Sequence, residues 1–297
     1  SFFSTMTANT SKWAYLWALS LIWGSSFILI KKALLGVTPL QVGTLRILLA
    51  ATAVLMIGGP SLKVISKTDW KWIGAAGLLS SFFPPLFFAL AQSEIDSGVT
   101  AIFNSLTPLN TTLVALAFFG AQMSRKQVIG VVIGLLGTWL LLATGASLRA
   151  DQNYAYVGFI LASSLGYALN INIIKNKLAH LGPMSITAGS FAVVVVPATL
   201  VLWSTGFAPD LSQVVVQQSL ISLLVLAVLG TALANILFNK LISLSSPVFA
   251  ASVTYTIPLV ALFWAWVDHE PLYPAQLAGG LIVLLGVYLT QKKPKKI

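Results

Sequence analysis

Two stretches, QVIGVVIGLLGTWL at residues 127–140 and QLAGGLIVLLGVYL at residues 276–289, are close to being the same segment written twice. The first glutamine, one glycine, one isoleucine, the Leu-Leu pair, the next glycine and the last leucine coincide, and Trp139 is matched by Tyr288. Both stretches are apolar throughout and lie near the ends of the two halves of the chain. The chain is therefore predicted to repeat itself, with residues 1–150 as one half and residues 151–297 as the other.

Two further pairs of segments have a similar offset. KKALLGVTPL from Lys31 resembles KNKLAHLGPM from Lys175. NSLTPLNTTLVALAFF from Asn104 and YTIPLVALFWAW from Tyr255 both carry a Pro-Leu pair inside an apolar segment. The repeat thus extends over the whole chain rather than one motif.

The composition is that of a membrane protein. Of 297 residues, 57% are hydrophobic and only 8% are charged, whereas soluble domains carry about 25% charged residues. The absence of cysteine excludes a disulfide framework and a Cys-based metal site. The net charge of +10 does not indicate nucleic-acid binding, because the basic residues fall in short loops.

A helix needs about 20 apolar residues to cross a bilayer. The sequence predicts an all-α integral membrane protein with ten transmembrane helices, and the first is expected to be a retained span rather than a removed signal peptide. The predicted spans are residues 13–31, 40–58, 71–91, 98–119, 127–145, 154–174, 183–203, 219–240, 247–267 and 275–290.

The loop charges orient these spans. With the N-terminus inside, the inner segments hold 13 of the 17 Lys and Arg residues, as the positive-inside rule requires. The outer loops hold three basic residues, Lys31, Lys32 and Arg149, and all but one of the acids. Both termini are therefore predicted to be cytoplasmic. Because each half has five spans, an odd number, the halves form an inverted 5+5 repeat, which is typical of secondary transporters. The inner basic residues are Lys12, Lys63, Lys67, Lys71, Arg125, Lys126, Lys175, Lys177, Lys240, Lys292, Lys293, Lys295 and Lys296.

Residues 13–290 resemble the EamA family of the drug/metabolite transporter (DMT) superfamily. The resemblance is carried by WALSLIWGSSFILIKKAL, TPLQVGTLRILLAA, the TPL and IPL helices and QLAGGLIVLLGVYL. It implies a ten-helix inverted repeat whose first, third and fourth spans, with their partners, line a central cavity. The family often has an acid before the fifth span of each half. Glu270 fits this pattern, but the first half has GAQMS there, without an acid.

Polar and aromatic residues within the spans are the candidates for substrate contact. Polar groups in a span are costly unless they face the bundle interior or a water-filled cavity. Hydroxyl and amide side chains also join helices by packing and hydrogen bonding, so both interpretations remain open. The substrate-contact candidates are Trp17, Trp23, Phe82, Asn104, Thr107, Tyr167, Asn170, Asn235, Phe238 and Tyr255.

Prolines and charges add a second group of candidates. Pro84, Pro85, Pro108 and Pro258 lie within predicted spans, where a proline kinks a helix and frees backbone carbonyls; they are predicted hinges or fixed bends. No predicted span contains Asp or Glu, which argues against a proton relay. Arg46 could bind a substrate carboxylate, snorkel outward, or pair with Glu94 or Asp96. Lys32 could turn toward the cavity mouth.

The predicted function is alternating-access transport of a small organic solute, most consistent with efflux of an amino acid or metabolite by facilitated diffusion or exchange. One alternative is an exporter of drugs, cations or lipid-like molecules; another is a membrane enzyme or assembly partner. The sequence contains no catalytic motif, metal-ligand spacing or nucleotide-binding loop, so no enzyme activity, metal or cofactor is expected. The predicted location is the bacterial inner membrane, as a monomer or homodimer that binds a small-molecule substrate and lipid but not nucleic acid.

Overall fold

A computed structural model describes residues 2–120, 124–148 and 151–291, and every regular element in these ranges is a helix. Arg149 and the four C-terminal lysines used in the orientation argument, Lys292, Lys293, Lys295 and Lys296, lie outside the described residues. The first half contains α1 (Phe2–Ala33), α2 (Pro39–Gly58), η1 (Gly59–Val64), α3 (Trp70–Gly77), η2 (Leu78–Phe82), α4 (Phe83–Gln92), α5 (Ser97–Asn104), α6 (Thr107–Phe119) and α7 (Arg125–Leu148).

The second half repeats this order. It contains η3 (Tyr154–Tyr156), α8 (Val157–Lys177), α9 (Pro183–Ser204), α10 (Val214–Ala227), η4 (Val228–Leu233), α11 (Ala234–Leu244), α12 (Pro247–Ala251), α13 (Val253–Val267) and α14 (Pro274–Gln291). In the described residues, eight helical segments are long and apolar enough to cross a membrane, and two shorter apolar helices, Val128–Leu140 and Pro274–Leu289, occupy the fifth predicted span of each half. The chain is thus a helical membrane protein, while the count of ten complete spans stays a prediction.

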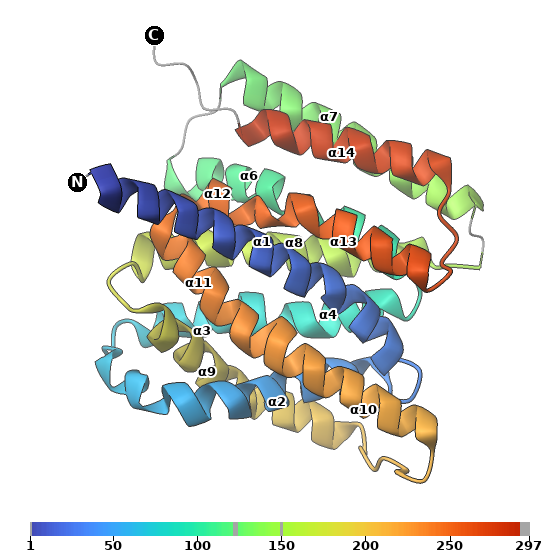
Figure 1. Ribbon diagram of the computed structural model, residues 1–297, viewed down its shortest axis with the longest axis horizontal. Coiled ribbons are helices and arrows are strands. Elements are labelled where there is room, and N and C mark those ends of the chain that lie inside the picture. Colours follow the sequence, from blue (N-terminus) through green and yellow to red (C-terminus); the bar gives the residue numbers. More distant parts are fainter. Residues whose placement is uncertain (1, 121–123, 149–150, 292–297) are drawn as a thin grey trace.

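The last helices of the two halves, α7 and α14, pack against each other along one edge of the molecule (Figure 1). Their glycines allow close backbone approach: a Cβ on Gly137 would lie 2.7 Å from the Val283 nitrogen, and a Cβ on Gly286 would lie 2.3 Å from the Gly134 nitrogen. As the residue number rises along α7, the contacted number falls along α14. The two counterpart helices are therefore antiparallel.

The helices α2 and α9, which lie along the opposite edge in Figure 1, follow the same rule. Gln41 at the start of α2 donates a 3.4 Å hydrogen bond to Thr205 just after α9, whereas Gly58 at the end of α2 lies against Ala188 near the start of α9. Counterparts in the two halves thus run in opposite directions, as an inverted repeat requires. The division at residue 150 and the cytoplasmic location of both termini stay predictions.

The third span of each half contains a π-helical segment, η2 in the first half and η4 in the second. Such segments are rare and occur frequently at functional sites, since they leave backbone carbonyls without regular partners. The fourth spans are also interrupted, at Ser105–Leu106 between α5 and α6 and at Ser252 between α12 and α13. Irregular backbone therefore gathers in the same four spans.

The prolines differ partly from the predicted kinks. Pro108 lies in the first turn of α6, and Pro84 and Pro85 lie in the first turn of α4. A helix leaves its first N–H groups without intrahelical partners, so Pro108, which follows the break at Ser105–Leu106, removes no helical hydrogen bond. Pro84 and Pro85 follow η2 without a break, inside one helical segment from Trp70 to Gln92, and Pro258 lies inside α13. Of the four, Pro108 is thus the one that begins a helix after a break, and a role as hinge or fixed bend stays a prediction for all of them.

Candidate functional site

A central pocket lies where the four irregular spans meet α1, α2 and α8. It contains about 570 Å³ of space between atoms, counting the part that is open to solvent. None of the described side chains of α7 and α14 contributes to its lining. The residues that line it are Trp23, Ser26, Phe27, Ile30, Arg46, Phe88, Asn104, Thr107, Tyr167, Ile171, Phe238, Ala251, Thr254 and Ile257.

Most of this lining obeys the internal repeat. The offset that relates Lys31 to Lys175 also relates two lining pairs, and the offset between Pro108 and Pro258 relates three more. Each half therefore contributes five matched residues, as expected of a pocket on the pseudo-two-fold axis, and three of the four unmatched lining residues belong to the first half. The five pairs are Trp23 with Tyr167, Phe27 with Ile171, Phe88 with Phe238, Asn104 with Thr254, and Thr107 with Ile257.

Two hydroxyl contacts join helices beside the pocket, and each uses one of the counterpart residues Ser20 and Ser164. Thr107 Oγ1 lies 3.3 Å from Ser164 Oγ and joins α6 to α8, and Ser20 hydrogen-bonds Thr256 and joins α1 to α13. Thr107 also donates to the Asn104 carbonyl at 2.8 Å, across the break between α5 and α6. A backbone group that the broken helix frees is thus satisfied by a hydroxyl, as the hydrocarbon region requires.

Aromatic rings form the wall on both sides of the pocket. The Trp23 indole donates from Nε1 to the Gly230 carbonyl of η4 at 3.1 Å. Its ring meets Phe238 edge to face, with centroids 4.9 Å apart, and Phe88 stacks against Tyr167 at 6.3 Å. A carbonyl that the π-helical segment leaves available therefore fixes one wall of the pocket.

Arg46 is the single charged residue of the pocket lining in the described chain. Its side chain, on α2, is buried, and its Nε donates a 2.6 Å hydrogen bond to Thr231 Oγ1 of η4. Thr231 in turn donates to the Leu226 carbonyl at 3.0 Å. Arg46 neither snorkels outward nor pairs with Glu94 or Asp96, so these two of its three predicted arrangements are wrong.

The structure brings six predicted residues together at the pocket: Trp23, Arg46, Asn104, Thr107, Tyr167 and Phe238. The others lie elsewhere. Trp17 is 54% exposed on the outer surface of α1. Phe82 belongs to the core around α2 and α9. Asn235 donates to the Thr231 carbonyl at 2.8 Å. Asn170, Tyr255 and the four prolines do not line the pocket, and Lys32 pairs with Asp268.

Sequence reasoning left out of the site Ser26, Phe27, Ile30, Phe88, Ile171, Ala251, Thr254 and Ile257. The repeat itself was the signal that could have found several of them. Applying the offset to Tyr167 gives Trp23, and applying it to Phe238 gives Phe88. A lining position that is polar in one half and apolar in the other can be identified only by aligning the two halves.

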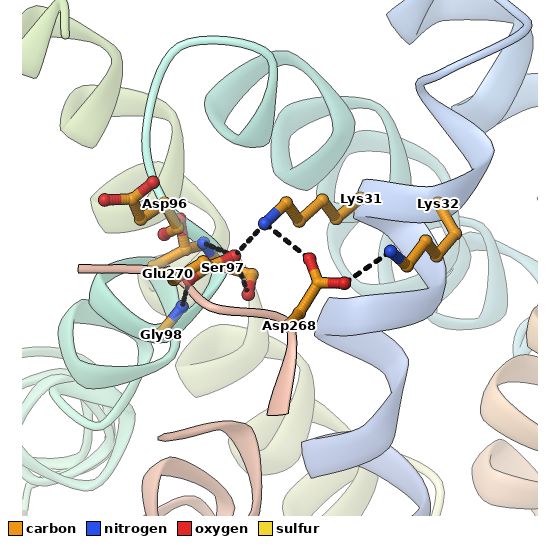
Figure 2. A network of polar contacts seen from close by, with 8 residues as sticks. Lys31, Lys32, Asp96, Ser97, Gly98, Asp268 and Glu270 are labelled. Atoms are coloured by element: carbon orange, nitrogen blue, oxygen red, sulfur yellow. Dashed lines mark hydrogen bonds and ion pairs between the residues drawn. The ribbon is translucent and has the colours of Figure 1, made fainter. Parts of the chain in front are cut away.

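An ion-pair latch is made of Lys31, Lys32, Asp268 and Glu270 (Figure 2). It begins directly after Ile30, a residue of the pocket lining. Lys31 Nζ lies 2.7 Å from Asp268 Oδ2 and 2.9 Å from Glu270 Oε1, and Lys32 pairs with Asp268. The latch connects the end of α1 to the loop between α13 and α14. Burial acts to raise the pKa of Asp268, but hydrogen bonds from the two lysines outweigh it, so the pKa lies below its ordinary value.

Glu270 extends the latch to the start of α5 (Figure 2). Its carboxylate accepts from Ser97 Oγ at 2.7 Å, from the Ser97 nitrogen at 3.4 Å and from the Gly98 nitrogen at 3.2 Å. A helix N-terminus favours negative charge, so this carboxylate is well placed. Lys31 and Glu270 also line a second, polar pocket, called here the polar mouth. The latch thus lies at the polar mouth and, through Ile30, next to the lining of the central pocket.

Comparison with known proteins agrees with this architecture. The model of the EamA-like transporter family matches the chain twice, over residues 12–143 and 155–291. A crystal structure with 15% sequence identity superposes with a TM-score of 0.66 over 95% of this chain and 96% of that one, and so shares the fold.

Three curated relatives match nearly end to end. A probable amino-acid metabolite efflux pump of Salmonella typhimurium is 27% identical over 90% of both chains. The uncharacterized inner membrane transporter YedA of Escherichia coli is 27% identical over 94% of this chain and 92% of its own. An uncharacterized transporter of Archaeoglobus fulgidus is 24% identical over 95% of this chain and 99% of its own.

These relatives are named as transporters rather than enzymes, which agrees with a helical bundle that surrounds one pocket on its symmetry axis. The family model covers both halves separately, just as the helix packing repeats in both. The chain is a multi-pass membrane transporter, and it belongs to the EamA-like transporter family.

Proposed function

We propose that this protein exports amino acids or related small metabolites across the bacterial inner membrane by alternating access, with the central pocket as the binding site. The observation that carries the proposal is the position of the pocket on the pseudo-two-fold axis, with matched residues from both halves. When inverted halves exchange conformations, such a site opens first to one side of the membrane and then to the other. The Salmonella relative named as an amino-acid metabolite efflux pump supports the substrate class.

The ion-pair latch acts as the gate on the outer side in this mechanism. It ties α1, α5 and the α13–α14 loop together between the central pocket and the polar mouth. Outward opening separates these elements and breaks the latch. Because a carrier without a coupling ion follows the gradient of its substrate, the latch sets which state is populated at rest and not the direction of net flux.

The alternatives have less support in the pocket. A drug or cation exporter would gain from an acid in the site, yet the charged residue in the described lining is Arg46. A membrane enzyme would need a cluster of titratable or metal-binding groups, and the described residues contain no group of three His, Cys, Asp or Glu side chains suited to a metal. One chain completes the pocket, so a monomer suffices for transport.

The test is a counterflow assay in proteoliposomes with labelled amino acids, organic cations and nucleotide sugars. Amino acids are expected to exchange and the other two classes are not. Thr254→Trp fills the pocket and should abolish exchange, whereas the matched Leu281→Trp, on a position of α14 that is 68% exposed, should retain it. Exchange of organic cations alone, or equal exchange by both variants, would refute the proposal.

A further inference from the structure

We infer that the transported solute carries a carboxylate and that Arg46 is the residue that binds it. This inference rests on the proposed function, because it assigns the chemical class of the substrate of the same pocket. Among the sequence interpretations of Arg46, it selects the substrate contact. Three features of the site support it: the burial of the guanidinium, its unfilled hydrogen bonds and the charge of the pocket lining.

A charged side chain inside a membrane protein is costly to bury and is normally paired or placed on a substrate pathway. Arg46 is only 7% exposed, so the guanidinium cannot rely on bulk water. The guanidinium has five N–H donors in a planar fork. Within the described chain it uses one of them, in the hydrogen bond from Nε to Thr231. The donors that remain belong to a residue that lines the pocket.

No acidic residue lines the central pocket among the described residues. The acids nearest to one end of it, Asp268 and Glu270, are engaged with Lys31 and Lys32. The charge of Arg46 is therefore left for a ligand. A planar guanidinium fork matches a carboxylate, with two parallel charge-assisted hydrogen bonds.

Arg46 also breaks the symmetry of the pocket. The offset that relates Lys31 to Lys175 assigns Ser190 as its counterpart, and Ser190 does not line the pocket. A symmetric cavity with one off-axis charge binds a solute in one orientation, with its carboxylate toward α2. The apolar body then lies against the rings on either side.

Thr231 positions the guanidinium. Its hydroxyl accepts from Arg46 Nε and donates to the Leu226 carbonyl, a bond that reaches back five residues from η4 to the end of α10. The π-helical segment thus places the Thr231 hydroxyl where it can hold the Nε edge of the Arg46 guanidinium. This leaves the other guanidinium nitrogens for the ligand. Thr231 is a positioning residue that acts through Arg46.

The experiment uses purified full-length protein and a panel based on valine, leucine and phenylalanine. Each compound is supplied in four forms: the amino acid, its amide, the acid without the amine, and the amine without the carboxylate. Thermal stabilisation of the protein and competition in counterflow are both measured. Forms with a carboxylate should stabilise and compete, whereas amides and amines should do neither.

The variants then assign the effect to Arg46. Arg46→Gln should weaken binding of the carboxylate forms roughly 10- to 100-fold, the size expected for losing hydrogen bonds between charged groups. Arg46→Lys should recover part of the loss, because charge returns without the fork. Thr231→Val should raise the apparent KM more than it lowers the maximal rate, and the matched Thr231→Ser should restore the original KM. Each variant is checked for a single peak in gel filtration.

The outcomes separate this inference from the proposed function. If amines or amides exchange as well as the acids do, or if Arg46→Gln keeps the preference for acids, the inference is overturned while the transporter proposal stands. If no compound exchanges or stabilises, both are overturned. A loss of the carboxylate preference in Arg46→Gln, with exchange of amides gained, supports both.

Discussion

Removing one charge from the ion-pair latch is expected to open the transporter to the outer side. The change is Glu270→Gln, which keeps the shape of the side chain. The amide oxygen can still accept from Ser97 or from Gly98, but not from both, because an NH2 group replaces one of the two acceptor oxygens; the ion pair with Lys31 is also lost. The closed state loses these contacts, while an open state, in which the latch is already broken, does not.

The size of the effect follows from the burial of each pair. The Glu270 side chain is 2% exposed, so its charged hydrogen bonds keep most of their strength. Losing the charge costs about 2 kcal/mol, allowing for the second partner that Lys31 retains in Asp268. This raises the ratio of open to closed protein about 30-fold. The Lys32 side chain is 45% exposed, so Lys32→Gln should change the ratio only about twofold.

Thiol labelling measures the population, because the chain contains no cysteine. Ile30→Cys introduces one thiol at a buried pocket position next to Lys31. A membrane-impermeant maleimide added from outside reacts with it only when the outer side opens. If the open state is minor, the labelling rate follows its population and should rise about 30-fold in Glu270→Gln.

The matched control is Asp210→Asn, which removes an acid that is predicted to lie on the same face. Asp210 accepts hydrogen bonds from Ser212 and Gln213 of its own loop and makes no contact with the latch. It should leave the labelling rate unchanged. If Glu270→Gln labels no faster than this control, or if the label enters faster from the inner side, the latch is not the outer gate.

Three further predictions concern packing, pH and the interrupted spans. Gly286→Val should lower the melting temperature by several degrees, because a Cβ would meet the Gly134 backbone at 2.3 Å, whereas Gly158→Ala, with nothing within 4 Å, should not lower it. Since the pKa of Asp268 is lowered in the folded protein, the stability that its carboxylate gives the fold should persist above the ordinary Asp pKa of about 3.9 and be lost as pH falls below it. The measurement is the difference in melting temperature between wild type and Asp268→Asn from pH 7 to pH 3. A difference that grows toward low pH would contradict the prediction. Pro258→Ala restores a donor inside α13 and should slow counterflow more than Pro108→Ala, which changes a first-turn position; equal rates would count against a role for the interior bend.

Most of the fold could be predicted from the sequence, because the patterns that specify it extend over many residues. Each predicted span is helical where the structure describes it. The match between residues 127–140 and 276–289 predicted related helices, and α7 and α14 indeed pack antiparallel through Gly137 and Gly286. Lys31 and Lys32 were exceptions to the positive-inside pattern. The structure gives the reason, since Asp268 and Glu270 neutralise them.

The residues of the site were harder to predict, because in a membrane both faces of a helix are apolar. Trp17 and Trp23 of the first span were both predicted to contact the substrate. The structure instead turns Trp17 outward and lines the pocket with Trp23, Ser26, Phe27 and Ile30. Lipid is as apolar as the protein interior, so hydrophobicity cannot select the face. The π-helical segments depend on tertiary packing and left no clear mark in the sequence.

The two ends of the molecule share a backbone plan but differ in charge. The offset between the final spans assigns Phe119 and Ala121 as the counterparts of Asp268 and Glu270, and neither is an acid. Lys175, the counterpart of Lys31, donates to the Ile242 carbonyl at 3.2 Å instead of pairing with a carboxylate. Among the described residues, the latch at the end of α1 thus has no equivalent at the end of α8, where the contact with a carboxylate is the one between His180 and Asp69. Since symmetric halves would populate their two conformations equally, we expect this difference to favour, in the predicted orientation, the state that is closed outside and open to the cytoplasm. In that state an exporter loads its substrate, and a bound solute must contribute the free energy that breaks the latch.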